Sequence, residues 1–192
     1  MRKIIFDCET KNTFQDVGSN KPEDLDLSLL VIYDYQTESY STFLEKDLPQ
    51  LWRILEETDI LIGYNSDHFD IPLLNKYYPG DLTQINSLDI LVEIKNAFGR
   101  RLRLDAVASG TLGIGKSGNG LDAIVWWKNG EIDKIAQYCK QDVRVTKDIY
   151  EYACAHGTLK YKDITGIQEF PIDTKHWNTP SSDTALNYTL PF

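Results

Sequence analysis

The chain has 192 residues, which is enough for one ordinary domain with a substantial core. Its apolar runs are far shorter than the roughly 20 residues that a bilayer requires, and its first residues lack a basic-apolar leader, so we expect neither a membrane span nor a secretory signal. The formal net charge of -9 excludes a protein that coats nucleic acid by bulk attraction, although an enzyme that grips one chain end stays possible. Three cysteines without a C-x-x-C pair indicate reduced thiols and a cytoplasmic location.

The first expected element is a buried strand over residues 3–7, which is rich in β-branched and aromatic residues and ends in acids. Side chains alternate across a strand, so Asp7 and Glu9 should leave the same face while Cys8 turns into the core. Two carboxylates at the end of a core strand repel each other unless a cation offsets their charge, and hard divalent cations prefer such oxygen ligands. The sequence therefore predicts that a metal site begins here.

Strands and helices follow in mixed order along the amino-terminal half. Residues 11–28 are polar and are expected to form a long loop beside the strand end. Residues 28–36 and 39–44 read as a hairpin, and 47–58 read as a helix with Asp47 as N-cap. The compact apolar run 59–63 predicts another strand, which turns at 64–70 into a helix that Pro79 and Gly80 end.

The carboxyl-terminal half reads as mainly helical. Helices are expected over residues 88–98, 104–112, 122–128 and about 131–155. Residues 158–163 and 167–172 then predict a hairpin, and beyond Asp173 the composition indicates a tail with Trp177 as its candidate anchor. We expect an α/β fold in which residues 1–155 form the domain and 156–192 form a hairpin and tail packed on it.

Further acids join Asp7 and Glu9 as candidate ligands. Asp70 lies just after a strand-to-helix turn, and Tyr138 and Asp142 are spaced i, i+4 on the longest expected helix, so they share one face. Four carboxylates and a tyrosine on one surface suit two divalent cations, Mg²⁺ or Mn²⁺, which together can activate a water and stabilise a leaving oxygen at a phosphodiester.

Three motifs carry a family resemblance. Asp7-Cys-Glu9, Asn65-x-x-x-Phe69-Asp70 and Tyr138-x-x-x-Asp142, in this order, resemble the motifs of the DEDD superfamily of 3′–5′ exonucleases, tyrosine subtype. The match is similar to the exonuclease domains of family B DNA polymerases and to their small stand-alone relatives. The first motif is the only D-x-E in the sequence, and a second Tyr-x-x-x-Asp, at Tyr77, contains Pro79-Gly80 and cannot form one helical face.

The resemblance implies a fold and a role for each motif residue. It implies a ribonuclease H-like mixed β-sheet flanked by helices, metal binding by Asp7, Glu9, Asp70 and Asp142, and placement of the nucleophilic water by Tyr138. Thr10 would sit where the family holds the terminal nucleotide, and Asn65 and Phe69 would support the second motif or touch the substrate strand.

Several residues have a second interpretation from local sequence. Asp70 could instead close a capping box with Asp67, which is the expected N-cap of its helix. Arg101 and Arg103 belong to a basic run that either complements a helix C-terminus or grips substrate phosphate. Lys116 is a candidate phosphate contact, and the Gly110-x-x-x-x-Gly115-Lys116-Ser117 pattern around it follows a helix rather than the strand that a phosphate loop requires.

The sequence thus predicts a metal-dependent 3′–5′ exonuclease that releases nucleoside monophosphates from single-stranded DNA, acting alone or with a polymerase or repair partner. One alternative keeps the site and changes the substrate to RNA. An alternative of another class is a non-catalytic module that binds nucleic acid or protein, although such a module gains nothing from concentrating negative charge beside phosphates.

Overall fold

A five-stranded mixed sheet forms the centre of the molecule in the computed structural model, which describes residues 1–115 and 120–179. Its strands are β1 (Lys3–Thr10), β2 (Leu27–Asp34), β3 (Ser39–Leu44), β4 (Ile60–Gly63) and β5 (Ser87–Asp89), in the order β3-β2-β1-β4-β5. The β1–β2–β3 meander is antiparallel, whereas β4 and β5 continue the sheet in parallel with β1. The expected α/β class and mixed sheet are confirmed.

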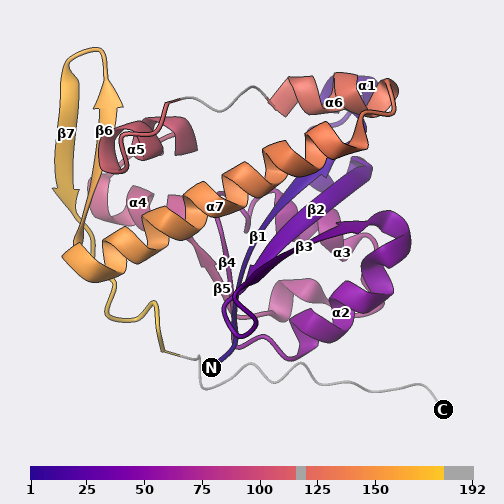
Figure 1. Cartoon of the computed structure of the whole chain (residues 1–192), viewed down its shortest axis with the longest axis horizontal. Helices are drawn as coiled ribbons and strands as arrows, with labels where there is room; N and C mark the ends of the chain where they lie inside the picture. The colour runs from indigo at the N-terminus through magenta and orange to yellow at the C-terminus, as the bar shows by residue number, and fades with distance from the viewer. Residues whose placement is uncertain (116–119, 180–192) are drawn as a thin grey trace.

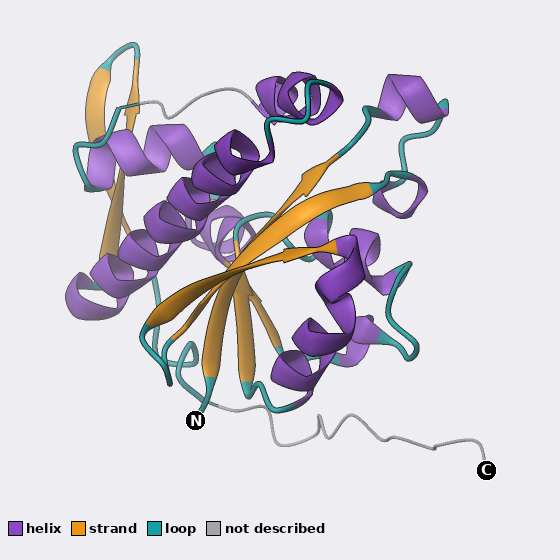
Figure 2. Ribbon diagram, turned by 45° about the vertical axis from the view of Figure 1, so that its right-hand side comes forward, coloured by secondary structure: helices purple, strands orange, loops and turns teal. Residues whose placement is uncertain are grey.

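Helices cover both faces of this sheet. The long helix α7 (Ile132–His156) crosses one face diagonally (Figure 1), while α2 (Leu48–Glu56) and α3 (Asp70–Asn75) cover the other (Figure 2). The central strand β1 is buried on both faces because its odd residue Ile5 packs in the α7-side core and its even residues Ile4 and Phe6 pack in the opposite core. This position explains why the strand is continuously apolar from Ile4 to Phe6.

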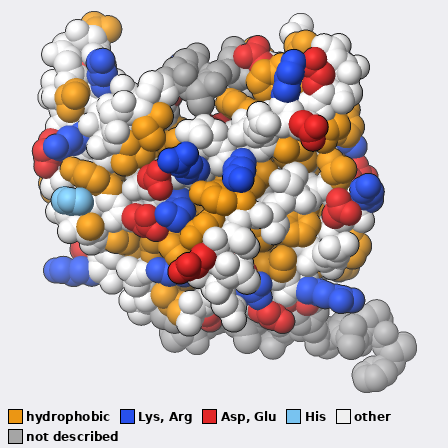
Figure 3. Space-filling view, in the orientation of Figure 1, with side chains coloured by type: hydrophobic (Ala, Val, Ile, Leu, Met, Phe, Trp, Pro, Cys, Tyr) orange, Lys and Arg blue, Asp and Glu red, His pale blue; other side chains and the backbone are white. Residues whose placement is uncertain are grey.

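The shorter helices lie around the ends of the sheet and of α7. They are α1 (Phe14–Val17), α4 (Ile90–Phe98), α5 (Leu104–Thr111) and α6 (Gly120–Lys128), with 3₁₀ turns at Pro22–Asp24, Glu45–Asp47 and Leu82–Gln84. On the surface that carries α7, acidic and basic side chains are interspersed (Figure 3). No helix in the described parts of the chain is long and apolar enough to cross a bilayer.

A separate two-stranded sheet follows α7, as predicted. It consists of β6 (Thr158–Asp163) and β7 (Gly166–Pro171) and packs against α5, α4 and the end of α7 (Figure 1). Beyond it Trp177 is 1% exposed, stacks on Tyr150 with ring centroids 5.8 Å apart, and donates its indole N–H to Glu93 at 3.0 Å. Trp177 therefore anchors the segment after the hairpin.

Three expected elements differ from the structure. The first strand runs to Thr10 rather than residue 7, because pairing with β2 continues past the acids. Residues 87–89 form the edge strand β5 where a helix from residue 88 was expected, because they pair with β4. The expected loop over residues 11–28 contains the short helix α1, and Thr13 and Asp16 form the capping box at its start.

One expected helix cap is wrong, and another is in place but makes no capping hydrogen bond. Phe69, not Asp67, is the N-cap of α3, and the Asp67 carboxylate accepts a hydrogen bond from the Ser87 hydroxyl at 2.5 Å instead of closing a capping box with Asp70. Asp47 occupies the N-cap position of α2, but its carboxylate accepts from the Leu44 N–H at 3.2 Å and makes no cap bond to the helix. In both cases the carboxylate accepts its hydrogen bond from a neighbouring element, and not from the helix N–H groups that the local sequence pattern indicated.

Candidate active site

Strand β1 supplies two of the site carboxylates. Asp7 and Glu9 share the α7-side face of the strand with Ile5, while Cys8 lies in the core on the opposite face, as the alternation predicted. Both acids are within the strand, and pairing with β2 fixes their backbone on one side. Glu9 is 8% exposed.

The third carboxylate comes from the start of α3. Asp70 is 4% exposed, and its Oδ1 accepts a hydrogen bond from the Cys8 N–H at 2.9 Å. Strand β4 runs parallel to β1 and so brings the chain to the same end of the sheet as Asp7 and Glu9. The turn that follows β4 then places α3 against β1. Asp70 thus reaches the first two acids although 60 residues of sequence separate them.

Helix α7 supplies the last two predicted side chains, Tyr138 and Asp142. The contact that fixes the helix over β1 is made by Cys139, whose Sγ lies 3.1 Å from the Asp7 carbonyl oxygen and 3.4 Å from its Oδ2. Sequence reasoning treated Cys139 only as a reduced thiol. The available signal was its position between Ile135 and Val143 at i, i+4 spacing, which marks the buried face of the helix.

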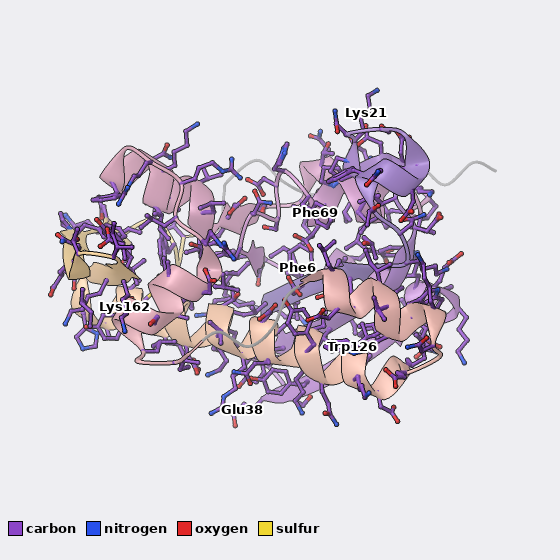
Figure 4. The ribbon with its side chains drawn as sticks, turned by 90° about the horizontal axis from the view of Figure 1, so that it is seen from above. Phe6, Lys21, Glu38, Phe69, Trp126 and Lys162 are labelled. Atoms are coloured by element: carbon purple, nitrogen blue, oxygen red, sulfur yellow. The ribbon has the colours of Figure 1, made fainter. Side chains whose placement is uncertain are left out.

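One pocket of about 430 Å³ brings together most of the predicted residues, but Arg101 and Arg103 are not among those that line it. Figure 4 looks onto the end of the sheet that carries the site, with Phe69 on one side of the centre and Trp126 of α6 on the other. The pocket has an acidic floor and largely apolar walls. Its predicted lining residues are Asp7, Glu9, Thr10, Asn65, Phe69, Asp70, Tyr138 and Asp142, and its apolar ones include Phe14, Leu25, Leu121 and Ile124.

Burial and mutual repulsion perturb the acids. Burial raises the pKa of Asp7 well above its usual range, and the negative charges of Asp70, Glu9 and Asp142 raise it further. Burial followed by repulsion from Asp142 and Asp70 likewise raises the pKa of Glu9. Burial raises the pKa of Asp70 to about 7, although its hydrogen bonds with Cys8 oppose the shift.

The donor set fits hard divalent cations. Ligand atoms of Asp7, Glu9 and Cys139 lie within 4.8 Å of one another, and Asp70 and Asp142 add further carboxylate oxygens to the same pocket. Bound cations would offset the repulsion that raises the pKa values of these acids. The Cys139 thiol donates to Asp7 and burial raises its pKa, so the carboxylate oxygens are the expected ligands, and these suit Mg²⁺ or Mn²⁺ better than softer ions.

Tyr138 keeps its proton at neutral pH. Burial is the main cause of its raised pKa, followed by the charges of Asp142 and Glu9 and a hydrogen bond to Asp142. Its ring packs edge-on against Trp126, with centroids 6.0 Å apart. The hydroxyl is therefore a hydrogen-bond donor held at the wall of the pocket.

The second motif depends on Asp89, the acid that directly precedes α4. Asn65 has a left-handed backbone (φ 66°), and its N–H donates to Asp89 Oδ1 at 2.8 Å. The same carboxylate accepts from the N–H groups of Asp67 at 3.2 Å and Leu91 at 2.9 Å. Asp89 thus holds the Asn65 turn and caps α4, and it does not line the pocket.

The remaining candidate substrate-binding residues differ in the groups that they contact. Thr10 donates its hydroxyl to the Asn12 carbonyl at 2.9 Å, and the Phe69 ring packs edge-on against Phe14. Arg103 pairs with Asp105 at 3.2 Å. The Arg101 guanidinium donates to Asn65 Oδ1. Lys116 and Ser117 lie outside the described residues.

Comparison with known proteins supports the fold and gives the family. No curated protein matches the sequence. Among solved structures, the family B DNA polymerase from the hyperthermophilic archaeon Pyrobaculum calidifontis is similar, with a TM-score of 0.60 and 19% sequence identity. The match covers 80% of this chain and 24% of that polymerase, so the chain spans about a quarter of its length. The family model of the RNase H superfamily matches residues 4–154, and the chain therefore belongs to that superfamily.

Proposed function

We propose that this member of the RNase H superfamily is a metal-dependent 3′–5′ exonuclease of the tyrosine DEDD subtype, which releases nucleoside monophosphates from single-stranded DNA. The observation that carries the proposal is the meeting of Asp7, Glu9, Asp70, Tyr138 and Asp142 in one pocket. These residues come from three separate elements, and their convergence has no packing advantage because burial of adjacent acids is unfavourable.

Each group has a chemical task in this proposal. The four carboxylates hold two divalent cations, which when bound supply charge neutralisation and polarisation at the scissile phosphate. The protonated Tyr138 hydroxyl orients the attacking water through a hydrogen bond. Phe69 and Phe14 offer an apolar wall to an unpaired base, and this wall favours a single-stranded end over a duplex.

The catalytic test is replacement of one ligand without loss of fold. Asp7→Asn keeps the size of the side chain but removes its charge, so we expect a loss of about 1000-fold in hydrolysis, equivalent to roughly 4 kcal/mol. Asp133→Asn is the matched control, because Asp133 is an exposed acid in the first turn of α7. Full activity of Asp7→Asn would contradict the site assignment.

The substrate test is a time course on 5′-labelled single-stranded DNA and on RNA of the same sequence, with Mn²⁺ or with EDTA. A metal-dependent ladder that shortens from the 3′ end of DNA is the expected result. Faster shortening of RNA would instead assign the chain to RNA trimming by the same site. The proposal includes no contact to a 2′-hydroxyl, so only this comparison of DNA with RNA distinguishes the two substrates.

A further inference from the structure

We propose that Arg101 binds a phosphodiester group of the substrate strand on the 5′ side of the scissile bond, an inference that rests on the proposed function. Arg101 lies in the segment that follows α4, outside the three motifs that carry the catalytic residues. It would position the strand rather than take part in the chemistry. The segment 99–103 and the Asn65 turn together form this phosphate clamp.

Two hydrogen bonds fasten this segment to the pocket wall. The Tyr64 hydroxyl donates to the Leu102 carbonyl at 2.8 Å, and the Arg101 guanidinium donates to Asn65 Oδ1. Tyr64 and Asn65 both line the pocket, and Leu102 is 8% exposed while Arg101 is exposed. A buried leucine therefore anchors the segment and leaves the guanidinium at the rim of the pocket.

The charges around the rim of the pocket also favour a phosphate contact by Arg101. The acidic floor repels a polyanion, so an approaching strand needs compensating cations. Neighbouring basic groups already face carboxylates: Lys11 pairs with Glu45 at 2.7 Å, Arg103 with Asp105 at 3.2 Å, and Arg100 lies 3.9 Å from Asp163. Within residues 1–115 and 120–179, Arg101 forms no ion pair, and its hydrogen bond is to a neutral amide. Its charge is thus available to a phosphate.

The geometry of the Arg101 guanidinium suits a phosphate group. A guanidinium carries five N–H groups in a rigid fork that matches two phosphate oxygens, and Asn65 Oδ1 engages only one nitrogen, Nη2. Asp89 fixes the left-handed backbone of Asn65 and so holds the amide that orients the fork. A cation that merely complemented the α4 dipole would point at the last helical carbonyls, whereas the hydrogen bond of Arg101 goes to the pocket wall.

The experiment combines a protein variant with neutralisation of single phosphates. The probe is a 5′-fluorescein oligothymidylate of eight nucleotides, either unmodified or with a methylphosphonate at one of its four 3′-most linkages. Affinity is measured by fluorescence anisotropy with Ca²⁺ in place of Mg²⁺, and each oligonucleotide is checked for intactness afterwards. Wild type is compared with Arg101→Gln and Arg101→Lys. Lys95→Gln is the control, since Lys95 is exposed on α4, lines no part of the pocket and carries the same charge.

Arg101→Gln should weaken binding of the unmodified probe by about 10-fold and lower the slope of log K against log salt by about 0.7, while Lys95→Gln changes the affinity less than about 2-fold. At one linkage, the methylphosphonate should lower the affinity of wild type about 10-fold and leave the affinity of Arg101→Gln almost unchanged. The substitution and the methylphosphonate remove the same contact, so their effects should not add. Arg101→Lys should keep the salt slope and lose part of the affinity, because lysine supplies the charge without the fork.

Two results would overturn the clamp: methylphosphonates that weaken Arg101→Gln and wild type equally at all four linkages, or equal losses in Arg101→Gln and Lys95→Gln. Neither depends on cleavage, so failure of the clamp is separable from failure of the proposed function. A wild-type chain that shows the non-additive effect yet never shortens the probe with Mn²⁺ would contradict the exonuclease and retain the clamp. A wild-type chain that does not bind the probe would contradict both.

Discussion

At the residue scale, burial sets the protonation of Asp70. Its carboxyl is enclosed between β1 and α3, and its pKa of about 7 is well above the ordinary value of 3.8. The folded protein therefore holds this proton more tightly than the unfolded chain. The resulting stability is complete below about pH 4 and is lost as the pH rises through about 7.

Asp70→Asn should remove this pH dependence. In EDTA at pH 8 we expect the variant to unfold at a temperature roughly 4–8 °C above wild type, corresponding to about 2 kcal/mol, because asparagine can still accept from the Cys8 N–H and carries no charge. The difference should shrink as the pH falls to 5. Thermal unfolding by circular dichroism across this range measures it, with Asp133→Asn as the exposed control.

Bound metal should reverse the order of the unfolding temperatures of wild type and Asp70→Asn. Saturating Mn²⁺ binds the folded wild type and raises its unfolding temperature, whereas the variant lacks one ligand and gains less. If Asp70→Asn were less stable than wild type at pH 8 in EDTA, the assigned direction of the pKa shift would be wrong.

At the element scale, a glycine decides how α5 meets the terminal hairpin. A Cβ built on Gly110 would lie 2.5 Å from the backbone Cα and carbonyl carbon of Tyr161 in β6. Next to it, the Thr111 hydroxyl donates to the Lys160 carbonyl at 2.6 Å and accepts from the Lys160 N–H at 2.9 Å. Helix and strand therefore approach backbone to backbone, and neither contact atom belongs to a side chain that could move aside.

Gly110→Ala should destabilise the protein despite the better helix propensity of alanine. Overpacking of this kind costs about 1–3 kcal/mol, against a gain of at most about 1 kcal/mol, so we expect a fall of several degrees in unfolding temperature. Gly115→Ala is the control, since a Cβ there meets no atom of the described residues within 4 Å. An unchanged or higher unfolding temperature for Gly110→Ala would mean that α5 and β6 separate at little cost.

At the scale of the whole molecule, the site exists only when three elements are assembled. Its four carboxylates come from β1, α3 and α7, and the Cys139 contact to Asp7 joins the first element to the last. Calorimetric titration with Mn²⁺ should give about two ions per folded chain, and Asp142→Asn should reduce the number or the affinity. Wild type that binds no Mn²⁺ would favour a non-catalytic binding module over a nuclease.

The sequence alone determined the class of fold and which side chains share a face within one element. Alternation along β1 placed Asp7 and Glu9 on one face, and i, i+4 spacing placed Tyr138 beside Asp142, because both relations depend only on the period of one element. The hairpin of β2 and β3 and the terminal hairpin were likewise readable from local turn signals. These are properties of short segments, so local sequence contains them.

Only the tertiary structure decided the relations between elements. The strand β5 exists because β4 lies beside it, Asp67 bonds to Ser87 rather than capping α3, and Asp89 holds the Asn65 turn. Cys139 and Gly110 gained their roles from partners 132 and about 50 residues away, and Arg101 from its contact with Asn65. Each of these pairings competes with a local alternative that is chemically reasonable, and which one prevails depends on the donor or backbone that folding brings next to the residue.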